Sequence, residues 1–429
     1  MDPERIAALF SKPLTINKLG LANRVVMGPM AANAPTKAGG PSDQTIAFYE
    51  ARAKGGVGMI IAGGIVATKR SLAEAPGKTS LRFDEDEFIP DLRRVADAVH
   101  KYGVPIIAEF IPGFGRMGRP GRGRPIISAS PKNVVIPEDR FPAGMLVPGG
   151  QVTSVPDEAT IEEIETYERE MIDAAVRAHK AGWDGVEIAF HMSYFGSSFL
   201  APRTNWRTDR YGGSAENRAR MLVNTISGIR QKLGRDYVVG ARMQADDYIP
   251  ESQGAAGFAG VAKFVEQAGI DYLALSPGCY ETMDTNCAAK DGVLVKDGVA
   301  RTFREALKVP LIVQGQHKPA NAAEVLEQGL GDLISFARPM LADPELANKL
   351  LSGRSDDIVR CDRQNTCVRR MIFGMEMRCT VNPTMGLESR KPGSLPPARR
   401  LIQVPIENAV LGLTGSKAVM GLVGKMMKK

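Results

Sequence analysis

Eight short apolar runs, most of them rich in β-branched residues, recur along the sequence with helix-like stretches between them. Strands that alternate with helices favour a parallel sheet, and eight such units are what a closed barrel requires. We therefore predict an α/β fold, a (β/α)8 barrel of the TIM type. The predicted strands begin at Arg24, Met59, Pro105, Gly185, Val238, Tyr272, Leu311 and Leu333.

The widest gap between predicted strands follows the third one, where residues 111–157 are rich in glycine, proline and arginine. We predict a long loop here, which is either a lid at the barrel rim or disordered. Thr160 and Glu163 have the spacing of a capping box and predict the start of the next helix.

This long loop carries a set of arginines that suits the phosphates of a coenzyme A thioester or a nucleic acid. Apart from Phe114, aromatic residues that would stack on bases are missing between them, so we predict no nucleic-acid binding. The arginines are Arg116, Arg119, Arg122 and Arg124.

Residues 186–218 form the most informative segment, VEIAFHMSYFGSSFLAPRTNWRTDRYGGSAENR. A short β-rich run leads into a long polar stretch, and Ser214 then provides an N-cap for a helix whose apolar residues recur at helical spacing. A strand, a charged loop and a helix in this order build the active-site rim of a barrel.

The second half of this segment, FLAPRTNWRTDRYGGSAENR, closely resembles the signature of the old yellow enzyme and 2,4-dienoyl-CoA reductase family of FMN-dependent oxidoreductases. The resemblance covers about residues 9–388. It implies an FMN-binding barrel over residues 1–390, including the cysteine-containing segment 361–379, followed by a linker and a short basic amphipathic tail over residues 391–429. It also implies NAD(P)H as the electron donor.

The resemblance implies that FMN lies across the strand ends at the barrel mouth. The residues after the first strand would lie against the flavin, Gly63 would admit the ring, and Arg242 would stabilise negative charge on the reduced ring. The phosphate is expected after the seventh and eighth strands. The implied FMN-binding residues are Pro29, Met30, Ala31, Gly63, Glu109, Arg242, Gly315, Ala337 and Arg338.

Glu109 departs from the family pattern, because most relatives have glutamine at this position after the third strand. A carboxylate beside the flavin edge opposes negative charge on the reduced ring unless the carboxyl is protonated or paired. We therefore expect Glu109 to alter the potential of the flavin or the way it binds.

The catalytic residues are also unusual. Many relatives grip a substrate carbonyl with a His-x-x-His or His-x-x-Asn pair, but the aligned positions here are Ala189 and Met192. Tyr194 matches the tyrosine that donates a proton in dienoyl-CoA reductases, and His191 is a second candidate. The histidine that assists after the sixth strand in some relatives has no counterpart in SPGCYETMDTNCAAK. The alternative is that both side chains only pack or form hydrogen bonds in the pocket.

Three cysteines near the end of the barrel region resemble part of an iron–sulfur motif, Cys-x2-Cys-x3-Cys-x11-Cys. Cys367 and Cys379 keep the last spacing, and Cys361 fits the first ligand if one residue is deleted, so Gln364 replaces the second cysteine. Two interpretations stay open: an iron–sulfur cluster held by these three thiolates, or free thiols at a site that has lost its metal.

Composition bounds the remaining possibilities. Five cysteines in 429 residues are too few for a disulfide scaffold, and neither a signal-peptide pattern nor a long apolar run is present, so we predict a cytoplasmic protein. A net charge of +7 favours anions in general. The four histidines offer no paired ligands at strand ends, which argues against a metal-dependent hydrolase.

After residue 390 the sequence becomes KPGSLPPARR, which predicts a linker, and then ENAVLGLTGSKAVMGLVGKMMKK, which predicts a basic amphipathic helix. This helix would dock on the barrel, fray, or contact a membrane or partner surface. No G-x-G-x-x-G follows a strand, so we expect electrons from a diffusible donor or a separate redox protein.

The leading functional hypothesis is hydride transfer from NAD(P)H through FMN to an activated alkene, an enone or an enoyl or dienoyl thioester. The alternatives are a flavin-dependent amine dehydrogenase or demethylase, and an electron-transfer flavoprotein subunit with little chemistry of its own. The sequence does not specify the substrate or the oligomeric state.

Overall fold

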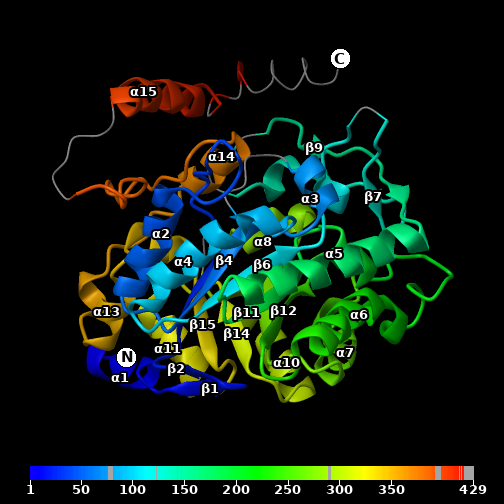
Figure 1. Cartoon of the computed structure of the whole chain (residues 1–429), viewed down its shortest axis with the longest axis horizontal. Helices are drawn as coiled ribbons and strands as arrows, with labels where there is room; N and C mark the ends of the chain where they lie inside the picture. Colours follow the sequence, from blue (N-terminus) through cyan, green and yellow to red (C-terminus); the bar gives the residue numbers. More distant parts are fainter. Residues whose placement is uncertain are drawn as a thin grey trace.

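The eight predicted strands are all present and close into one parallel barrel in this computed structural model (Figure 1). The structure describes residues 1–429 except 76–80, 122, 143, 146, 288–290, 392–397, 415, 417 and 420–429. The strands pair in the order β3, β15, β14, β13, β12, β11, β6 and β4, and β4 pairs with β3 to complete the circle. They are β3 (Val25–Met30), β4 (Met59–Val66), β6 (Ile106–Ile111), β11 (Gly185–Phe190), β12 (Val238–Asp246), β13 (Tyr272–Pro277), β14 (Leu311–Gln314) and β15 (Leu333–Phe336).

Side chains alternate between the two faces of each strand, so the apolar core has two parts, one inside the barrel and one between the barrel and its helices. Val25 and Met27 of β3 pack outward with the helices, whereas Val26 packs inward with the first residues of neighbouring strands, such as Met59. The hairpin of β1 (Leu14–Ile16) and β2 (Leu19–Leu21) adds Ile16 to this inner cluster and closes the amino-terminal end of the barrel. The carboxyl ends of the strands are thus left for polar groups.

Helices surround the barrel and connect its strands (Figure 1). The predicted capping box is confirmed: Thr160 accepts from the Glu163 backbone, and the Glu163 side chain accepts from the Thr160 backbone. Ser214 caps the following helix, as predicted. The helices are α1 (Pro3–Phe10), α2 (Asp43–Lys54), α3 (Lys69–Glu74), α4 (Ile89–His100), α5 (Ile161–Lys180), α6 (Ala215–Leu233), α7 (Gly254–Gln267), α8 (Met283–Asn286), α9 (Val293–Lys296), α10 (Val299–Ala306), α11 (Pro319–Glu327), α12 (Arg338–Ala342) and α13 (Leu346–Leu351).

The long loop after β6 contains short strands of its own. β7 (Ile127–Ser128) pairs with β10 (Asp157–Glu158), and β8 (Val135–Ile136) pairs with β9 (Gln151–Val152). Together with α3 this segment lies on the side of the barrel opposite the β1–β2 hairpin (Figure 1). The loop therefore forms part of the rim around the carboxyl ends of the strands.

Two of the four arginines singled out in this loop bond to neighbouring segments. Arg116 is buried and donates to the backbone carbonyl oxygens of Lys132 and Asn133, while Arg124 donates to the carbonyl oxygen of Ala73. Arg122 lies outside the described residues. Arg119 is exposed. Arg116 and Arg124 thus bond the loop to its surroundings.

Two further helices follow the barrel, α14 (Thr366–Ile372) and α15 (Ala398–Leu413). α15 begins inside the stretch predicted as a linker, so the linker is shorter than expected. Buried Glu407 pairs with Arg370 of α14, which docks α15 there, whereas Leu401 and Ile402 face solvent. The basic end of the predicted tail lies outside the described residues. The predicted boundary at residue 390, between the barrel region and the linker with its tail, stays a prediction.

No helix in the described part of the chain is both long enough and apolar enough to cross a membrane.

Candidate active site

A buried guanidinium lies between two carboxyl groups at the centre of the strand ends. Arg242 of β12 is only 1% exposed; its Nε donates to Glu187 Oε1 of β11 at 2.7 Å and lies 3.1 Å from Glu109 Oε1 of β6. Its Nη1 donates to Gln314 Oε1 of β14 at 2.7 Å. Nη2 is buried without a hydrogen-bond partner in the described part of the protein. One donor of this cation is therefore available to a ligand.

The environment of Glu109 favours its protonated form. Burial raises the pKa of Glu109 to about 8, with Arg242 opposing the rise and Glu187 adding to it. The protonated form of Glu109 is therefore favoured near neutral pH, and in that form its carboxyl can donate a hydrogen bond, as the amide of glutamine does. Protonation, one of the two conditions under which a carboxyl at this position is compatible with a reduced flavin, is thus favoured.

His191 directly follows β11 and is neutral. Its Nδ1 lies 3.0 Å from Ser276 Oγ of β13, and its Nε2 lies 3.8 Å from Glu109 Oε1. Burial, together with the positive charge of Arg242, lowers the pKa of His191 to about 3. An imidazolium is thus disfavoured here, and His191 can act as a neutral hydrogen-bond donor or acceptor.

Tyr194 lies beside His191 and forms a hydrogen-bonded phenol pair with Tyr280. The two hydroxyl oxygens are 3.1 Å apart, and the Tyr194 ring meets His191 and Phe114 edge to face. Burial, reinforced by Tyr280, raises the pKa of Tyr194 well above its usual value, so the phenol stays protonated. Tyr280 was missed by sequence reasoning, although its place after the sixth strand is where a helper residue was sought.

The turn that carries Tyr194 has an unusual backbone. Met192 and Ser193 have positive φ angles of 56° and 57°, a conformation that favours glycine. Ser193 Oγ donates to Glu281 Oε2 at 2.9 Å and accepts from the backbone N–H of Tyr280 at 3.2 Å. These bonds hold the strained turn against the loop after β13 and position the two phenols.

Glu281 is the second residue that sequence reasoning missed. Burial opposes its ionisation, but Arg116 and Arg203 outweigh this and hold the pKa of Glu281 to about 2. Arg116 comes from the long loop after β6, and Arg203 comes from the loop after β11. The carboxylate therefore ties three rim loops together around Tyr194.

The predicted flavin-bed residues meet where β3 and β4 end. A Cβ placed on Gly63 would lie 2.8 Å from the carbonyl carbon of Pro29, so only glycine fits beside that backbone. The register between β3 and β4 shifts here, between Met27 and Met30. Ala31 lies close by, because a Cβ on Gly64 would approach Ala31 Cβ within 2.7 Å. The need for a small residue at position 63 thus comes from close backbone approach.

The predicted phosphate-binding residues meet at the ends of β14 and β15. Gly315 has a φ of +89° and open space where a Cβ would stand. Arg338 Nη1 donates to Asn365 Oδ1 at 2.6 Å, and Nη2 lies 3.3 Å from His317 Nε2. Burial and the cation of Arg338 lower the pKa of His317 to about 3. Ala337, next to Arg338, occupies the N-cap position of α12.

Several buried polar atoms near these strand ends have no partner in the described part of the protein. They include Arg242 Nη2, Gln316 Nε2, His317 Nδ1 and Ser335 Oγ. Buried donors without partners are costly unless a ligand satisfies them. Together with the open space at Gly315, this donor set fits a polar, anionic cofactor such as FMN.

The three predicted iron–sulfur ligands do not form a ligand set. Among the described residues, no group of three or more His, Cys, Asp or Glu side chains is arranged to hold a metal ion. Cys361, Cys367 and Cys379 are free thiols in this structure. With Gln364 in place of a fourth cysteine, these residues do not fit the cluster.

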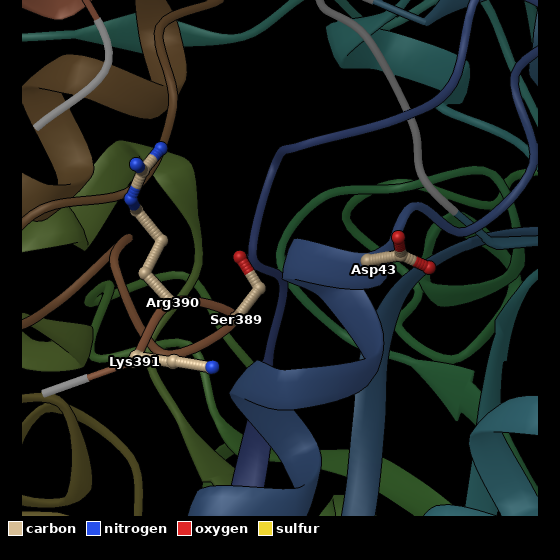
Figure 2. A pocket seen from close by; sticks show the side chains of 4 residues that line it. All are labelled: Asp43, Ser389, Arg390 and Lys391. Atoms are coloured by element: carbon tan, nitrogen blue, oxygen red, sulfur yellow. The ribbon is translucent and has the colours of Figure 1, made fainter. Parts of the chain in front are cut away.

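A separate open pocket lies at the start of α2, lined by Asp43, Ser389, Arg390 and Lys391 (Figure 2). Asp43 pairs with Arg94, and Ser389 donates to Gln44. None of the predicted flavin-binding or catalytic residues lines this pocket. It is therefore distinct from the candidate active site.

Comparison with known proteins agrees with this site. The sequence profile of the NADH:flavin oxidoreductase / NADH oxidase family matches residues 8–357. The chain is 32% identical to an NADH oxidase of Thermoanaerobacter brockii, over 94% of this chain and 59% of that protein. It is 31% identical to a cinnamate reductase of Clostridium sporogenes, over 88% of this chain and 58% of that protein.

A solved 2-naphthoyl-CoA reductase superposes with a TM-score of 0.78 at 27% identity, covering 91% of this chain and 59% of that one. The chain therefore spans less than two thirds of the length of these relatives. The profile match nevertheless extends over nearly the whole barrel, with the closed eight-stranded sheet and the polar strand ends described above. The chain belongs to the NADH:flavin oxidoreductase / NADH oxidase family, which includes the old yellow enzymes.

Proposed function

We propose that this protein is an FMN-dependent reductase that moves hydride from NAD(P)H to an activated alkene, an enone or an enoyl or dienoyl thioester. The observation that carries this proposal is the half-buried Tyr194–Tyr280 phenol pair beside neutral His191 at the barrel mouth. Two relatives whose names specify cinnamate and 2-naphthoyl-CoA as substrates support this substrate class.

The residues that would hold FMN divide among three parts of the barrel mouth. Pro29, Met30, Ala31 and Gly63 would form the bed for the ring, Arg242 and Glu109 would donate to its polar edge, and Gly315, Ala337 and Arg338 would bind the phosphate. When bound, FMN supplies hydride transfer between the nicotinamide and the alkene. The unpartnered Arg242 Nη2 supports this assignment, because a ligand atom would complete its hydrogen bonds.

The proton that completes alkene reduction comes from Tyr194 in this proposal. A phenol with a raised pKa is fully protonated at neutral pH, so its proton is present when the substrate binds. His191 is a poorer acid here, because an imidazolium is not populated at neutral pH when its pKa is about 3. We therefore assign Tyr194 as the proton donor and give His191 a hydrogen-bonding role.

The test is a two-step anaerobic experiment on the flavin-loaded protein. NADH or NADPH is added until the flavin absorbance is bleached, and then 2-cyclohexen-1-one, cinnamate or a dienoyl thioester is mixed in. We expect at least one of these alkenes to restore the oxidised flavin spectrum and to yield the saturated product. Failure of every alkene to reoxidise the reduced flavin would contradict the proposal.

Two alternative functions would give different results in the same anaerobic experiment. Relatives named as amine dehydrogenases also match the chain, which supports oxidation of a secondary or tertiary amine as the second candidate. Bleaching by dimethylglycine without nicotinamide would favour it. Reduction by a partner redox protein, but not by NADH or NADPH, would instead identify an electron-transfer subunit.

The proposed setting is the cytoplasm, because all five cysteines are free thiols, as a reducing compartment favours. The proposed partners are a small-molecule substrate and, where nicotinamide is not the donor, a redox protein. An iron–sulfur cluster has no part in this proposal.

A further inference from the structure

The hydrogen bonds around His191 determine which of its nitrogens carries the proton. Ser276, which lies in β13, is the partner of Nδ1, and Ser276 Oγ is also 3.3 Å from Asn286 Nδ2 of α8. A serine hydroxyl has one hydrogen and can accept bonds on its oxygen. The direction of the bond to His191 therefore depends on what Asn286 does.

The amide of Asn286 has a defined orientation. Its Nδ2 donates to the backbone carbonyl oxygen of Pro277 at 3.0 Å, and a carbonyl oxygen only accepts hydrogen bonds. The nitrogen of the Asn286 amide must therefore face the Pro277 carbonyl oxygen, and its second N–H is the one directed at Ser276 Oγ. Ser276 thus accepts from Asn286, and its own hydrogen is left for another acceptor.

His191 Nδ1 is the acceptor for that hydrogen. Among the described residues, Ser276 Oγ has hydrogen-bond contacts only with His191 and Asn286. If His191 carried its proton on Nδ1 and donated to Ser276, the serine hydrogen would have no acceptor at a buried position. The arrangement therefore favours an Nδ1 that accepts and a proton on Nε2.

The other side of the imidazole faces the centre of the site. Nε2 is 3.8 Å from Glu109 Oε1, beyond hydrogen-bond distance, and the ring lies edge to face with Tyr194. An N–H at this position is available to an acceptor on a ligand. Ala189 and Met192, at the positions aligned with the usual carbonyl-gripping pair, supply no such donor.

We propose that Asn286 and Ser276 are positioning residues that hold His191 in its Nε2–H tautomer, so that His191 donates a hydrogen bond to the carbonyl oxygen of the substrate. This inference rests on the proposed alkene reductase function and names the group that orients its substrate. A carbonyl bound at Nε2 would bring the neighbouring carbon–carbon double bond to the part of the site where the Tyr194 ring meets His191.

The tautomer can be measured directly by 15N NMR on the flavin-loaded full chain labelled at histidine. The chain contains only four histidines, and the His191→Phe variant assigns the His191 signals by their loss. We expect Nε2 to show the shift of a protonated ring nitrogen and Nδ1 that of an unprotonated one. The opposite pattern, or equal populations, would overturn the inference.

Asn286→Asp provides the sharpest variant. An aspartate accepts the Ser276 hydrogen instead of donating to the hydroxyl, so the remaining bond must be donated by His191 Nδ1. We expect the proton to move from Nε2 to Nδ1 in this variant. An unchanged tautomer in a folded Asn286→Asp protein would contradict the role of Asn286.

Ser276→Ala and Ser276→Thr test the same network if Asn286→Asp does not fold. The alanine variant should give a mixture of tautomers, whereas threonine keeps the hydroxyl and should keep the Nε2–H form. A pure Nε2–H form in Ser276→Ala would show that the serine does not set the tautomer, and would overturn the inference.

Cyclohexanone is a suitable probe for the carbonyl contact, because it has no alkene to reduce. We expect its carbonyl stretch to shift to lower frequency on binding, and its affinity to fall about 3- to 10-fold in Ser276→Ala, with recovery in Ser276→Thr. An unshifted carbonyl stretch would contradict the contact. The NMR result does not depend on turnover, so failure of the proposed reaction would leave the tautomer assignment standing.

Discussion

At the residue scale, Glu109 shows how a carboxyl group can occupy a position where an amide is expected. The cation of Arg242 lies 3.1 Å from it and the imidazole of His191 lies 3.8 Å away, while burial raises the pKa of Glu109 to about 8. A protonated carboxyl and a glutamine amide both offer one donor and one acceptor. Glu109 therefore supports the same contacts as glutamine at neutral pH and loses its donor at higher pH.

This raised pKa predicts a pH-dependent stability. In the unfolded chain Glu109 ionises near its ordinary value of 4.5, whereas the folded protein keeps the proton to about pH 8. The unfolded state thus releases its proton first, and raising the pH across this window destabilises the folded protein. Glu109→Gln removes the effect, so its free energy of unfolding relative to the wild type should increase by at least about 1 kcal/mol between pH 5 and pH 8.

Urea unfolding of flavin-free protein at several pH values measures this difference. Glu251→Gln changes an exposed carboxylate and should show no such trend. A constant difference between Glu109→Gln and the wild type across the range would mean that Glu109 is ionised in the folded protein.

The proposed role of Tyr194 predicts that its replacement slows flavin reoxidation but not flavin reduction. Tyr194→Phe removes the proposed proton donor but leaves the ring and its edge contacts with His191 and Phe114. Stopped-flow absorbance should show flavin reduction by NAD(P)H at nearly the wild-type rate. Reoxidation by the alkene should slow by about 100-fold or more, as expected for loss of a general acid.

Tyr280→Phe is the matched comparison, because it removes only the partner of the phenol pair. A smaller effect on reoxidation is expected, since Tyr194 keeps its own proton. Equal rates for Tyr194→Phe and the wild type in both steps would show that Tyr194 only packs in the pocket.

At the scale of elements, the contact between β3 and β4 limits what the flavin bed can tolerate. The two strands lose register beside Gly63, and such irregularities often shape active sites. Gly63→Ala places a methyl group 2.8 Å from the Pro29 backbone, which must move. We expect a loss of about 1–3 kcal/mol in stability, measured by urea unfolding, together with weaker FMN binding.

Gly20→Ala in β2 is the control for this substitution. Its added methyl group meets no heavy atom within 4 Å, so we expect a change within about 0.5 kcal/mol. If Gly63→Ala matched this control in both stability and FMN affinity, the strand contact would not be the reason for glycine at position 63.

At the scale of the whole molecule, the barrel was predictable from sequence because each strand is a buried parallel strand that contains a short apolar run. The N-caps at Thr160 and Ser214 were predictable because capping depends on residues within one turn. Tyr280 and Glu281 were not, because their roles arise only where the loop after β13 meets the loops after β6 and β11. Sequence spacing does not encode such contacts between distant loops.

In the cysteine region the sequence left two interpretations open. The spacing between Cys367 and Cys379 suggested a metal site, but ligand geometry also depends on the fourth position, where Gln364 stands. In the structure the neighbourhood is built instead on hydrogen bonds of Arg338 and Arg363, to Asn365 and Asp291. Spacing in the chain was therefore a weaker guide to this site than to the barrel.

FMN binding should stabilise the whole barrel, because the predicted contacts come from strand ends around its circumference, from β3 and β4 to β14 and β15. A ligand that binds only the folded state stabilises it by about 2.7 kcal/mol at 100 times its dissociation constant. We expect FMN to raise the unfolding temperature, and riboflavin, which lacks the phosphate, to raise it less.

Arg338→Met tests whether the phosphate lies at the ends of β14 and β15. Loss of a charge-assisted hydrogen bond should weaken FMN binding by about 10- to 100-fold while leaving riboflavin binding nearly unchanged, because only FMN carries the anion. Fluorescence titration of both flavins separates this effect from any general loss of stability, since Arg338 also bonds to Asn365. An equal loss for both flavins would place the phosphate elsewhere on the barrel mouth.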